Sequence, residues 1–305
     1  MRRPMLSREP IRKPQALNLE ALFYWPAAML LGLVVAYPIL RTTVLSFTQM
    51  SLHTAFQPEF TGAQNYLRLA FDSRFHNSLT ITAAFTIISV ALEFALGLCL
   101  ALTVGTFIRG RGIIRSFLLA PWTLPTAIIA VLWAWIFNDQ YGVLNVLLLK
   151  MSVIHTPIAW LAEPGSAMAS IIIADVWKTT PFVFLVLLAG IQSVPRDLYE
   201  AIEMDGGGAW AKFRYVTWPF LLPFVFISLI FRIIQSFAIF DLVYVMTGGG
   251  PGGATETVSV YSYQTYMRYL DIGYGSAQVV AVVIILAVTA YMLYQLLLKR
   301  YARLF

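Results

Sequence analysis

The sequence is poor in charged residues and holds a single cysteine. Only 12% of its 305 residues are Asp, Glu, Lys or Arg, against roughly 25% in a typical soluble domain, and 59% are hydrophobic. Because there is only one cysteine, a disulfide within the chain is excluded. This residue, Cys99, lies inside an apolar run, a position typical of a small buried hydrophobic residue. This composition excludes a soluble globular domain.

Motifs of several enzyme classes are also missing from the sequence. It contains no G-x-x-x-x-G-K-[ST] phosphate loop, no H-E-x-x-H pair and no G-x-S-x-G nucleophile turn. Its three histidines, His53, His76 and His155, lie between the apolar runs, whereas a membrane haem or zinc site requires histidines within them. We therefore expect no catalytic residue, no metal site and no cofactor bound by this chain.

Long apolar runs are what the sequence does contain. Six of them are long enough to cross a hydrocarbon core of ~30 Å as helices, namely 21–44, 79–106, 113–137, 166–192, 219–246 and 276–298. We expect an all-α polytopic membrane protein with about six transmembrane helices. Its transmembrane domain spans 21–298, between an N-terminal tail over 1–20 and a C-terminal tail over 299–305.

Lysine and arginine are unequally distributed between the segments that flank these runs. The N-terminal tail holds five, and the 107–115 turn, the 193–218 loop and the C-terminal tail hold three each, whereas the three opposite loops together hold four. By the positive-inside rule, both termini and the 193–218 loop are cytoplasmic. The net charge of +6 thus reflects orientation in the bilayer, and we expect no nucleic-acid partner. The first run is too long for a signal peptide and lacks a cleavage site, which favours a retained anchor.

The loop between the fourth and fifth runs reads YEAIEMDGGGAWAKFRYVTWP. Glu200 and Glu203 lie three apart, on one face of a helical turn. Three glycines, Gly206 to Gly208, end this helix, and a second short helix is expected over Ala209–Thr217. Asp205 either contacts a partner or caps the following turn. By pattern alone, an ordinary polar loop is an equally good interpretation.

This loop resembles the EAA loop of bacterial ABC importer permeases. The family pattern is E-A-A, then D-G-A/G beginning three residues after the second alanine, and then a hydrophobic run that ends in L-P; Ile202 and Trp218 depart from it. In that family the loop forms the coupling helix, which docks in a groove of the ATPase subunit. The resemblance implies that ATPase coupling is carried here by Glu200, Ala201, Asp205, Gly206, Gly207 and Phe213, ahead of the matching Pro219.

The resemblance covers about residues 25–298, and it points to one particular group of ABC permeases. The segments FTGAQNYLRL, APWTLPTAIIAVLWAWIFNDQYGVLNVLL, DVWKTTPFVFLVLLAGIQSVPRDLYEA and TGGGPGGATETVSVYSY are similar to carbohydrate-uptake permeases of the maltose and glycerol-phosphate importer type. That resemblance implies a type I ABC importer permease fold in the bacterial cytoplasmic (inner) membrane. It also implies import of a disaccharide, oligosaccharide or sugar-phosphate-like solute by alternating access.

The same resemblance implies the partners of the chain. They are a second homologous permease subunit, two ATPase subunits that carry the ATP and Mg, and an extracytoplasmic solute-binding protein, besides membrane lipid. Whether the second permease is a different chain or a copy of this one stays open. Two other functions also stay open: an ABC permease for a non-sugar solute such as a polyamine or amino acid, and a stand-alone carrier or channel, which needs no coupling loop.

Five ionisable residues stand out within the predicted spans: Glu93, Asp175, Lys178, Arg232 and Asp241. Such residues usually face a cavity or a partner, because a charge in lipid is costly. Asp175 and Lys178 are three apart and can pair along one helix face. For Glu93 we expect a helix-packing contact.

A sugar site needs hydrogen-bonding side chains and aromatic rings that stack on the C–H faces of the sugar. Arg232, Gln235 and Ser236 form a polar patch on the fifth span. The resemblance to the maltose-type permease puts Thr179, Phe182, Arg232 and Ser236 at or beside positions that line its sugar site.

Further residues could bind the solute or hold the structure. Trp133, Trp135 and Trp177 are available for stacking, beside Phe182. In the alternative interpretation, Lys178 and Arg232 do not contact the solute. They are structural and form ion pairs with Asp175 and Asp241 or with the partner subunit.

Overall fold

The computed structural model describes residues 19–106 and 111–301, which are mostly helical. The elements are α1 (Leu19–Leu31), η1 (Gly32–Ala36), α2 (Tyr37–Leu45), β1 (Thr48–Gln49), η2 (Leu52–Thr54), β2 (Glu59–Phe60), α3 (Gln64–Phe71), α4 (Ser73–Thr106), α5 (Arg111–Thr123), α6 (Thr126–Ile136), α7 (Val143–Lys150), α8 (Pro164–Gln192), α9 (Arg196–Met204), α10 (Ala209–Ala211), η3 (Lys212–Thr217), α11 (Trp218–Phe237), α12 (Asp241–Met246), α13 (Val258–Tyr263), η4 (Gln264–Arg268) and α14 (Ile272–Tyr301). β1 and β2 pair antiparallel. The predicted N-terminal tail up to residue 18, Arg109 and residues 302–305 lie outside the described residues.

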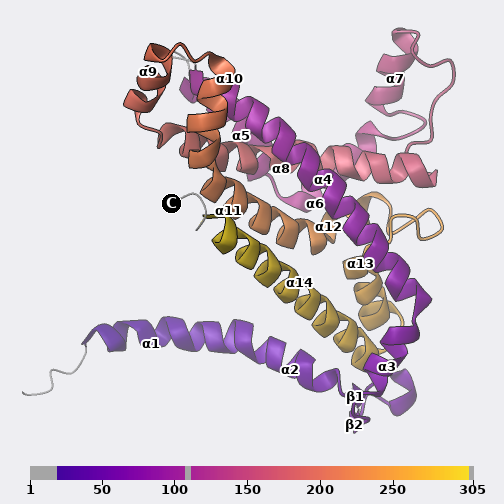
Figure 1. Cartoon of the computed structure of the whole chain (residues 1–305). Coiled ribbons are helices and arrows are strands. Elements are labelled where there is room, and N and C mark those ends of the chain that lie inside the picture. The colour runs from indigo at the N-terminus through magenta and orange to yellow at the C-terminus, as the bar shows by residue number, and fades with distance from the viewer. Residues whose placement is uncertain (1–18, 107–110, 302–305) are drawn as a thin grey trace, which may run out of the picture.

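Among the described residues, five helices are long and apolar enough to cross a membrane, and a bent pair brings the number to as many as six. The five are α1–η1–α2, α4, α8, α10–η3–α11 and α14, and the bent pair is α5 with α6. This confirms the all-α polytopic class. Figure 1 shows the start of α1, α9, α10 and the end of α14 on one side of the molecule, with β1, β2, α3 and α7 on the other.

Two of the six predicted spans are broken in the structure. The span predicted over 113–137 bends by 93° between α5 and α6. Pro125 causes this break, because proline lacks an N–H and disfavours helical backbone at Leu124 before it. The span predicted over 219–246 is interrupted between α11 and α12 at residues 238–240, which contain neither proline nor glycine.

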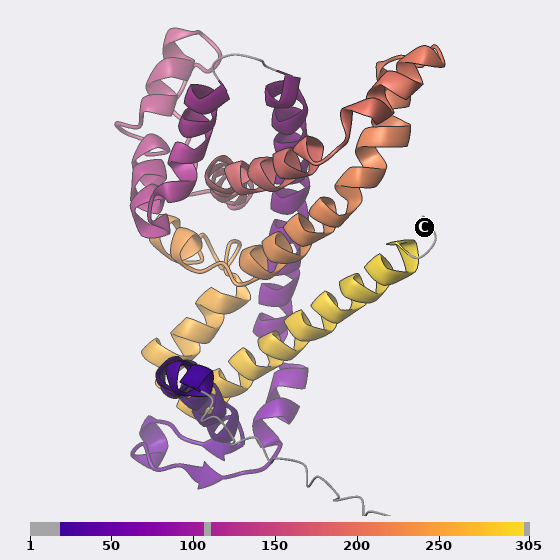
Figure 2. The ribbon, with the colours of Figure 1, turned by 90° about the vertical axis from the view of Figure 1, so that its left-hand side faces the viewer.

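The core of the molecule lies where α4, α8 and α11 cross (Figure 2). Phe184 and Leu187 of α8 are fully buried there against Ala101 of α4 and Leu221 of α11. Lipid is as apolar as these side chains, so close packing and polar contacts hold such helices together rather than escape from water. The polar contacts among these three helices therefore matter for the function as well as for the fold.

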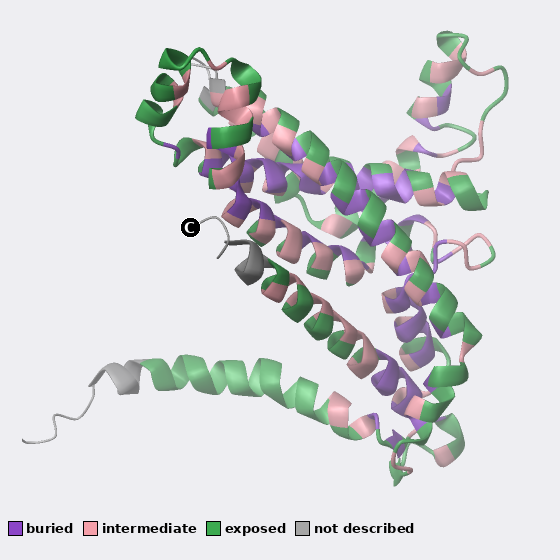
Figure 3. Cartoon of the chain, in the orientation of Figure 1, coloured by how far each residue is buried: buried purple, intermediate pink, exposed green. Residues whose placement is uncertain are grey.

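The arm α1–η1–α2 stands apart from this core. Every residue described from Tyr24 to Arg41 is exposed (Figure 3). Apolar residues also cover the outer faces of other helices, as expected of surfaces that meet lipid or another subunit. Cys99 is among them: the prediction that it is buried is wrong, since it is exposed on α4 beside an apolar hollow.

Asp72 joins three helices at the end of the molecule that carries the strands. Its Oδ1 accepts hydrogen bonds from the backbone N–H groups of Arg74 and Phe75 and so caps α4, and its Oδ2 accepts from the hydroxyls of Tyr261 and Tyr274. Partial burial raises the pKa of this carboxyl, but the four hydrogen bonds outweigh burial and hold the pKa below its ordinary 3.8. Burial, and then the bond to Asp72, raise the pKa of Tyr261 to about 12.

Replacing Asp72 by alanine is expected to lower the free energy of unfolding by about 2–3 kcal/mol, because it removes a helix cap and two hydrogen bonds to a charged group. Since the folded pKa is depressed, the contribution of the carboxylate is present at neutral pH and is lost as the pH falls below 3.8 towards that folded pKa. Thermal unfolding of the purified chain in detergent measures both effects. Asp139→Ala, at an exposed aspartate, is the control, and an equal loss in both variants would contradict this role.

Candidate functional site

A buried ion cluster joins α4, α8 and α11. Arg232 is 3% exposed, and its Nε and Nη2 donate to the two carboxylate oxygens of Glu93, which is fully buried. Nη2 also donates to Asp175 Oδ2 at 3.3 Å. The hydroxyl of Ser89 lies 2.6 Å from Asp175 and 2.9 Å from Glu93, and that of Thr179 lies 2.7 Å from Glu93. One cation thus holds two carboxylates from different helices.

A cavity of about 490 Å³ lies beside this cluster. It forms where the bend between α5 and α6 and the break between α11 and α12 both meet α8, so the two interruptions of the predicted spans create its walls. The predicted residues that line it are Asp175, Lys178, Thr179, Arg232, Gln235 and Asp241. Sequence reasoning missed the other lining residues, which are Trp122, Thr126 and the three residues of the 238–240 break.

Five predicted residues do not line this cavity, and one of them, Trp135, is exposed. Phe182 packs between Trp122, at 6.0 Å between ring centres, and Phe231, so it supports the wall from behind. Ser236 is buried. Trp133 and Trp177 contact each other edge to face, and Trp177 lines the apolar hollow beside Cys99. Their predicted contact with a solute stays a prediction.

The charged pairs differ from those expected. Lys178 Nζ donates to Thr126 Oγ1 at 2.7 Å, and no ion pair between Lys178 and Asp175 occurs within residues 19–106 and 111–301. Asp175 faces Arg232 instead, which agrees with the structural alternative for that arginine. Glu93 packs helices together, as expected, but it does so as the main partner of Arg232. An acid in an apolar run needs a counter-charge, and that requirement was the available indication.

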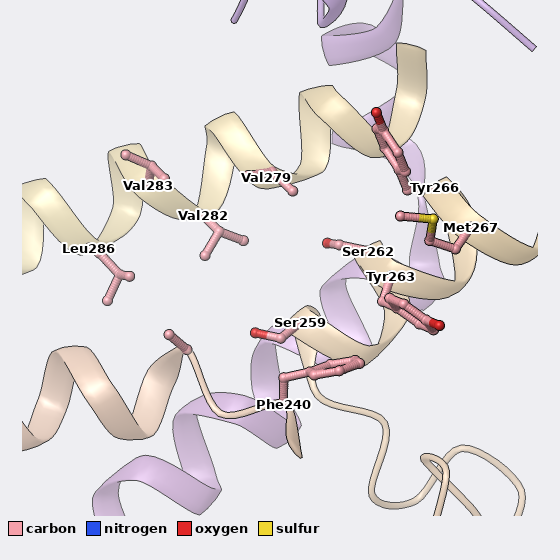
Figure 4. Close-up of a pocket in the computed structure, with 11 residues that line it drawn as sticks. Phe240, Ser259, Ser262, Tyr263, Tyr266, Met267, Val279, Val282, Val283 and Leu286 are labelled. Carbon is pink, nitrogen blue, oxygen red and sulfur yellow. The ribbon is translucent and has the colours of Figure 1, made fainter. Parts of the chain in front are cut away.

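A second hollow, of about 450 Å³, lies between α13, η4 and α14 (Figure 4). Apolar and hydroxyl-bearing side chains such as Phe240, Tyr263, Met267 and Val282 line it, and no ionisable Asp, Glu, Lys, Arg or His does so. Phe240 faces both hollows. Only the first of these two hollows combines ionisable side chains with amides, hydroxyls and aromatic rings.

The glycine-rich loop between α8 and α11 folds as a helix end. Gly206 N–H donates to the carbonyl of Glu203 at 3.0 Å, and Gly207 N–H donates to that of Ile202 at 2.8 Å, the two bonds of a Schellman motif. Gly206 adopts φ +76°, where only glycine is unstrained. A Cβ on Gly207 would lie 2.4 Å from Ile202 Cγ2. The prediction that these glycines end the first helix is confirmed.

The second short helix, predicted over Ala209–Thr217, forms but is not separate. α10 and η3 continue directly into α11 and make one uninterrupted rod. The loop is closed by an ion pair between Lys212 and Glu203 and by a 3.0 Å hydrogen bond between the hydroxyls of Tyr199 and Thr217. α9 is therefore held against the rod that leads into the core.

The surface of this loop carries exposed acidic and apolar groups. Glu200, Ala201 and Asp205 are all exposed. Gly208 is the N-cap of α10 and no side chain caps that helix, which leaves the Asp205 carboxylate out of the capping role.

Large apolar side chains surround these acids. Met204 is 88% and Trp210 is 72% exposed. Phe213 is half-buried between Trp210 and Trp218, with ring centres 5.8 and 5.9 Å away. An exposed apolar patch rimmed by charge is typical of a protein–protein contact.

Comparison with known proteins places the chain among transport proteins. Residues 93–303 match the family described as binding-protein-dependent transport system inner membrane component. A trehalose/maltose transport system permease protein of Thermococcus litoralis is 42% identical over 85% of this chain and 91% of its own length. A sulfoquinovosyl glycerol transport system permease protein of Agrobacterium fabrum is 39% identical over 85% and 83%, and a trehalose transport system permease protein of Mycobacterium tuberculosis is 36% identical over 89% and 86%.

A solved structure shares the fold at low sequence identity. The chain matches a bacterial ABC transporter involved in the import of the acidic polysaccharide alginate with a TM-score of 0.80, 18% identity, and coverage of 92% of this chain and 95% of that one. At this identity the match bears on the fold alone. It confirms the predicted permease fold.

Proposed function

This chain belongs to the family of binding-protein-dependent transport system inner membrane components, and we propose that it is a transmembrane subunit of an ATP-driven importer that moves a carbohydrate across the bacterial inner membrane. Relatives named for trehalose, maltose and sulfoquinovosyl glycerol transport support the carbohydrate. One observation carries the mechanism: the α9–α10 loop directly connects α8 and α11, the two helices that supply Lys178 and Arg232 to the polar cavity.

Force applied to this loop reaches the cavity through rigid elements. The Schellman motif fixes α9, and the bonds to Lys212 and Thr217 fix α9 to the rod that becomes α11. ATP and Mg bind to the partner ATPase subunits, whose closure moves α9. Glu200 and Asp205, with the apolar side chains around them, form the surface on which that ATPase docks. Alternating access then follows from a shared movement of α8 and α11.

The exposed arm supports a second permease subunit as partner. Six spans or fewer do not enclose a translocation path, and α1–η1–α2 leaves its full circumference exposed from residue 24 to residue 41. A second, homologous chain covers part of this arm and closes the cavity from the other side. The start of α1, the α9–α10 loop and the end of α14 lie on the same side of the molecule (Figure 1), which supports cytoplasmic termini. An extracytoplasmic solute-binding protein docks at the opposite end, near α3 and α7.

A photoreactive amino acid at Leu33 or Val34, which are 67% and 61% exposed, is expected to cross-link to the second permease in membranes that express the full importer. The readout is a covalent dimer band whose two chains are identified by mass spectrometry. A heterodimer shows that the second permease is a different chain, and a homodimer shows that it is a copy of this one. Labelling of lipid alone, at normal expression of every subunit, would contradict the proposed contact.

The proposed function is tested by co-purifying the chain with its neighbours and screening solutes for stimulation of ATP hydrolysis in the presence of the solute-binding protein. Carbohydrates are expected to stimulate ATP hydrolysis. Stimulation by a polyamine or amino acid and by no carbohydrate would overturn the assignment of a carbohydrate as the transported solute. Transport by this chain in proteoliposomes without any ATPase subunit would overturn the importer and indicate a stand-alone carrier.

A further inference from the structure

The ionisable groups at the cavity are unequally free to bind a solute. The Nε hydrogen and both Nη2 hydrogens of Arg232 are donated to Glu93 and Asp175, and Nη1 donates to Gln235 at 3.0 Å. Of its five N–H groups, one therefore remains to donate to a solute. A guanidinium held this way by two buried carboxylates is a fixed part of the wall rather than a free ligand.

Lys178 differs from Arg232 in both burial and bonding. It is half-buried, and its ammonium group donates one of its three hydrogens to Thr126. The other two are available to oxygen atoms in the cavity. Asp241 is exposed at the first turn of α12, on the same cavity, and its carboxylate accepts no side-chain hydrogen bond in the described part of the chain. Lys178 and Asp241 are therefore the available donor and the available acceptor.

The charge on this wall does not suit an anion. Arg232 and Lys178 supply two positive groups, against the three carboxyl groups of Glu93, Asp175 and Asp241. An excess of carboxylates over cations repels a sugar acid or sugar phosphate. A neutral sugar hydroxyl, which both donates and accepts, suits a lysine and an aspartate at once, and Trp122 on the same wall offers a ring to its C–H face.

We propose that Lys178 and Asp241 are the charged pair of this chain that contacts the solute, and that they select a neutral carbohydrate over an acidic one. Arg232, held by Glu93, positions α8 and α11 so that the pair faces the cavity. This inference rests on the proposed function and narrows its substrate class.

The experiment uses the purified full importer without its solute-binding protein, so that only the membrane cavity is probed. Saturation-transfer NMR compares three neutral disaccharides with the acids made by oxidising them: maltose with maltobionate, lactose with lactobionate, and cellobiose with cellobionate. Each pair differs in the charge and in the opened terminal ring. Competition titrations convert the signals into relative affinities.

At least one neutral sugar is expected to bind about tenfold or more tightly than its acid. Lys178→Met is expected to weaken the binding of that sugar by a similar factor. Asp241→Asn is expected to weaken its binding and to reduce the difference in affinity between the sugar and its acid. Lys150→Met, the same substitution at an exposed lysine outside the cavity, is expected to change neither.

Three results would overturn the inference, each in a different way. Binding of an acid as tight as that of its neutral partner refutes the neutral class and leaves the carbohydrate importer intact. An unchanged neutral affinity in Lys178→Met refutes the role of the lysine. Binding of none of the six sugars, together with ATPase stimulation by another solute class, refutes the proposed function and this inference with it.

Discussion

Replacing Gly206 by proline is expected to reduce ATP-driven uptake by about a hundredfold or more, by analogy with enzymes, in which a ~1 Å misplacement caused by a remote mutation can cost about that much in rate. Gly206 has φ +76°, and proline is locked near −65°. Proline also removes the N–H that bonds to Glu203. The Schellman motif cannot form, so α9 loses its fixed position relative to α10. The measurement is sugar uptake per ATP hydrolysed by the reconstituted importer.

Gly208→Pro is the matched control for this variant. Gly208 has φ −79°, which proline adopts, and a Cβ there meets no atom within 4 Å. Proline at this position precedes the first turn of α10, where its missing N–H is tolerated. The control should keep most of the uptake. If Gly206→Pro transports as well as Gly208→Pro at equal expression, the loop is not the coupling element.

Replacing Arg232 by methionine is expected to destabilise the chain by about 3–5 kcal/mol, the usual cost of leaving buried charges without their partner. The change leaves Glu93 and Asp175 facing each other without a cation. The double variant Glu93→Gln with Arg232→Met removes one charge of each sign, so it should recover a large part of the loss. Thermal unfolding of the purified importer, arranged as a double-mutant cycle, measures the coupling.

The cycle separates an ion pair from simple packing. If the losses of the two single variants add in the double variant, Glu93 and Arg232 act independently and the cluster does not hold α4 to α11. Asp175→Asn is a further comparison, since its longer 3.3 Å contact with Arg232 predicts a smaller loss than Glu93→Gln.

The loop between α8 and α11 was predictable because its physics is local. Three glycines after an acidic turn end a helix by backbone conformation alone, and the two Schellman bonds join residues three and five positions apart. The break at Pro125 also carried a local indication, although the apolar run around it favoured one straight span. These features follow from a few neighbouring residues.

The cavity was only partly predictable, because its walls depend on distant contacts. Arg232 and Glu93 are 139 positions apart, and nothing near either residue indicates the other. The 238–240 break contains no proline or glycine, so Phe240 was read as part of a continuous span. Trp122 and Thr126 enter the cavity through the 93° bend. Helix packing decided these placements, and a single sequence does not contain it.

The two helix breaks have a consequence for water. Each break takes backbone N–H and carbonyl groups out of the helical ladder at a depth where lipid offers no hydrogen bond, and such backbone is tolerated only where it is buried in protein or lines a hydrated space. We therefore expect water in this polar cavity whenever no solute occupies it. A solute that binds there is then expected to replace water at the polar side chains of the wall rather than to enter a dry space.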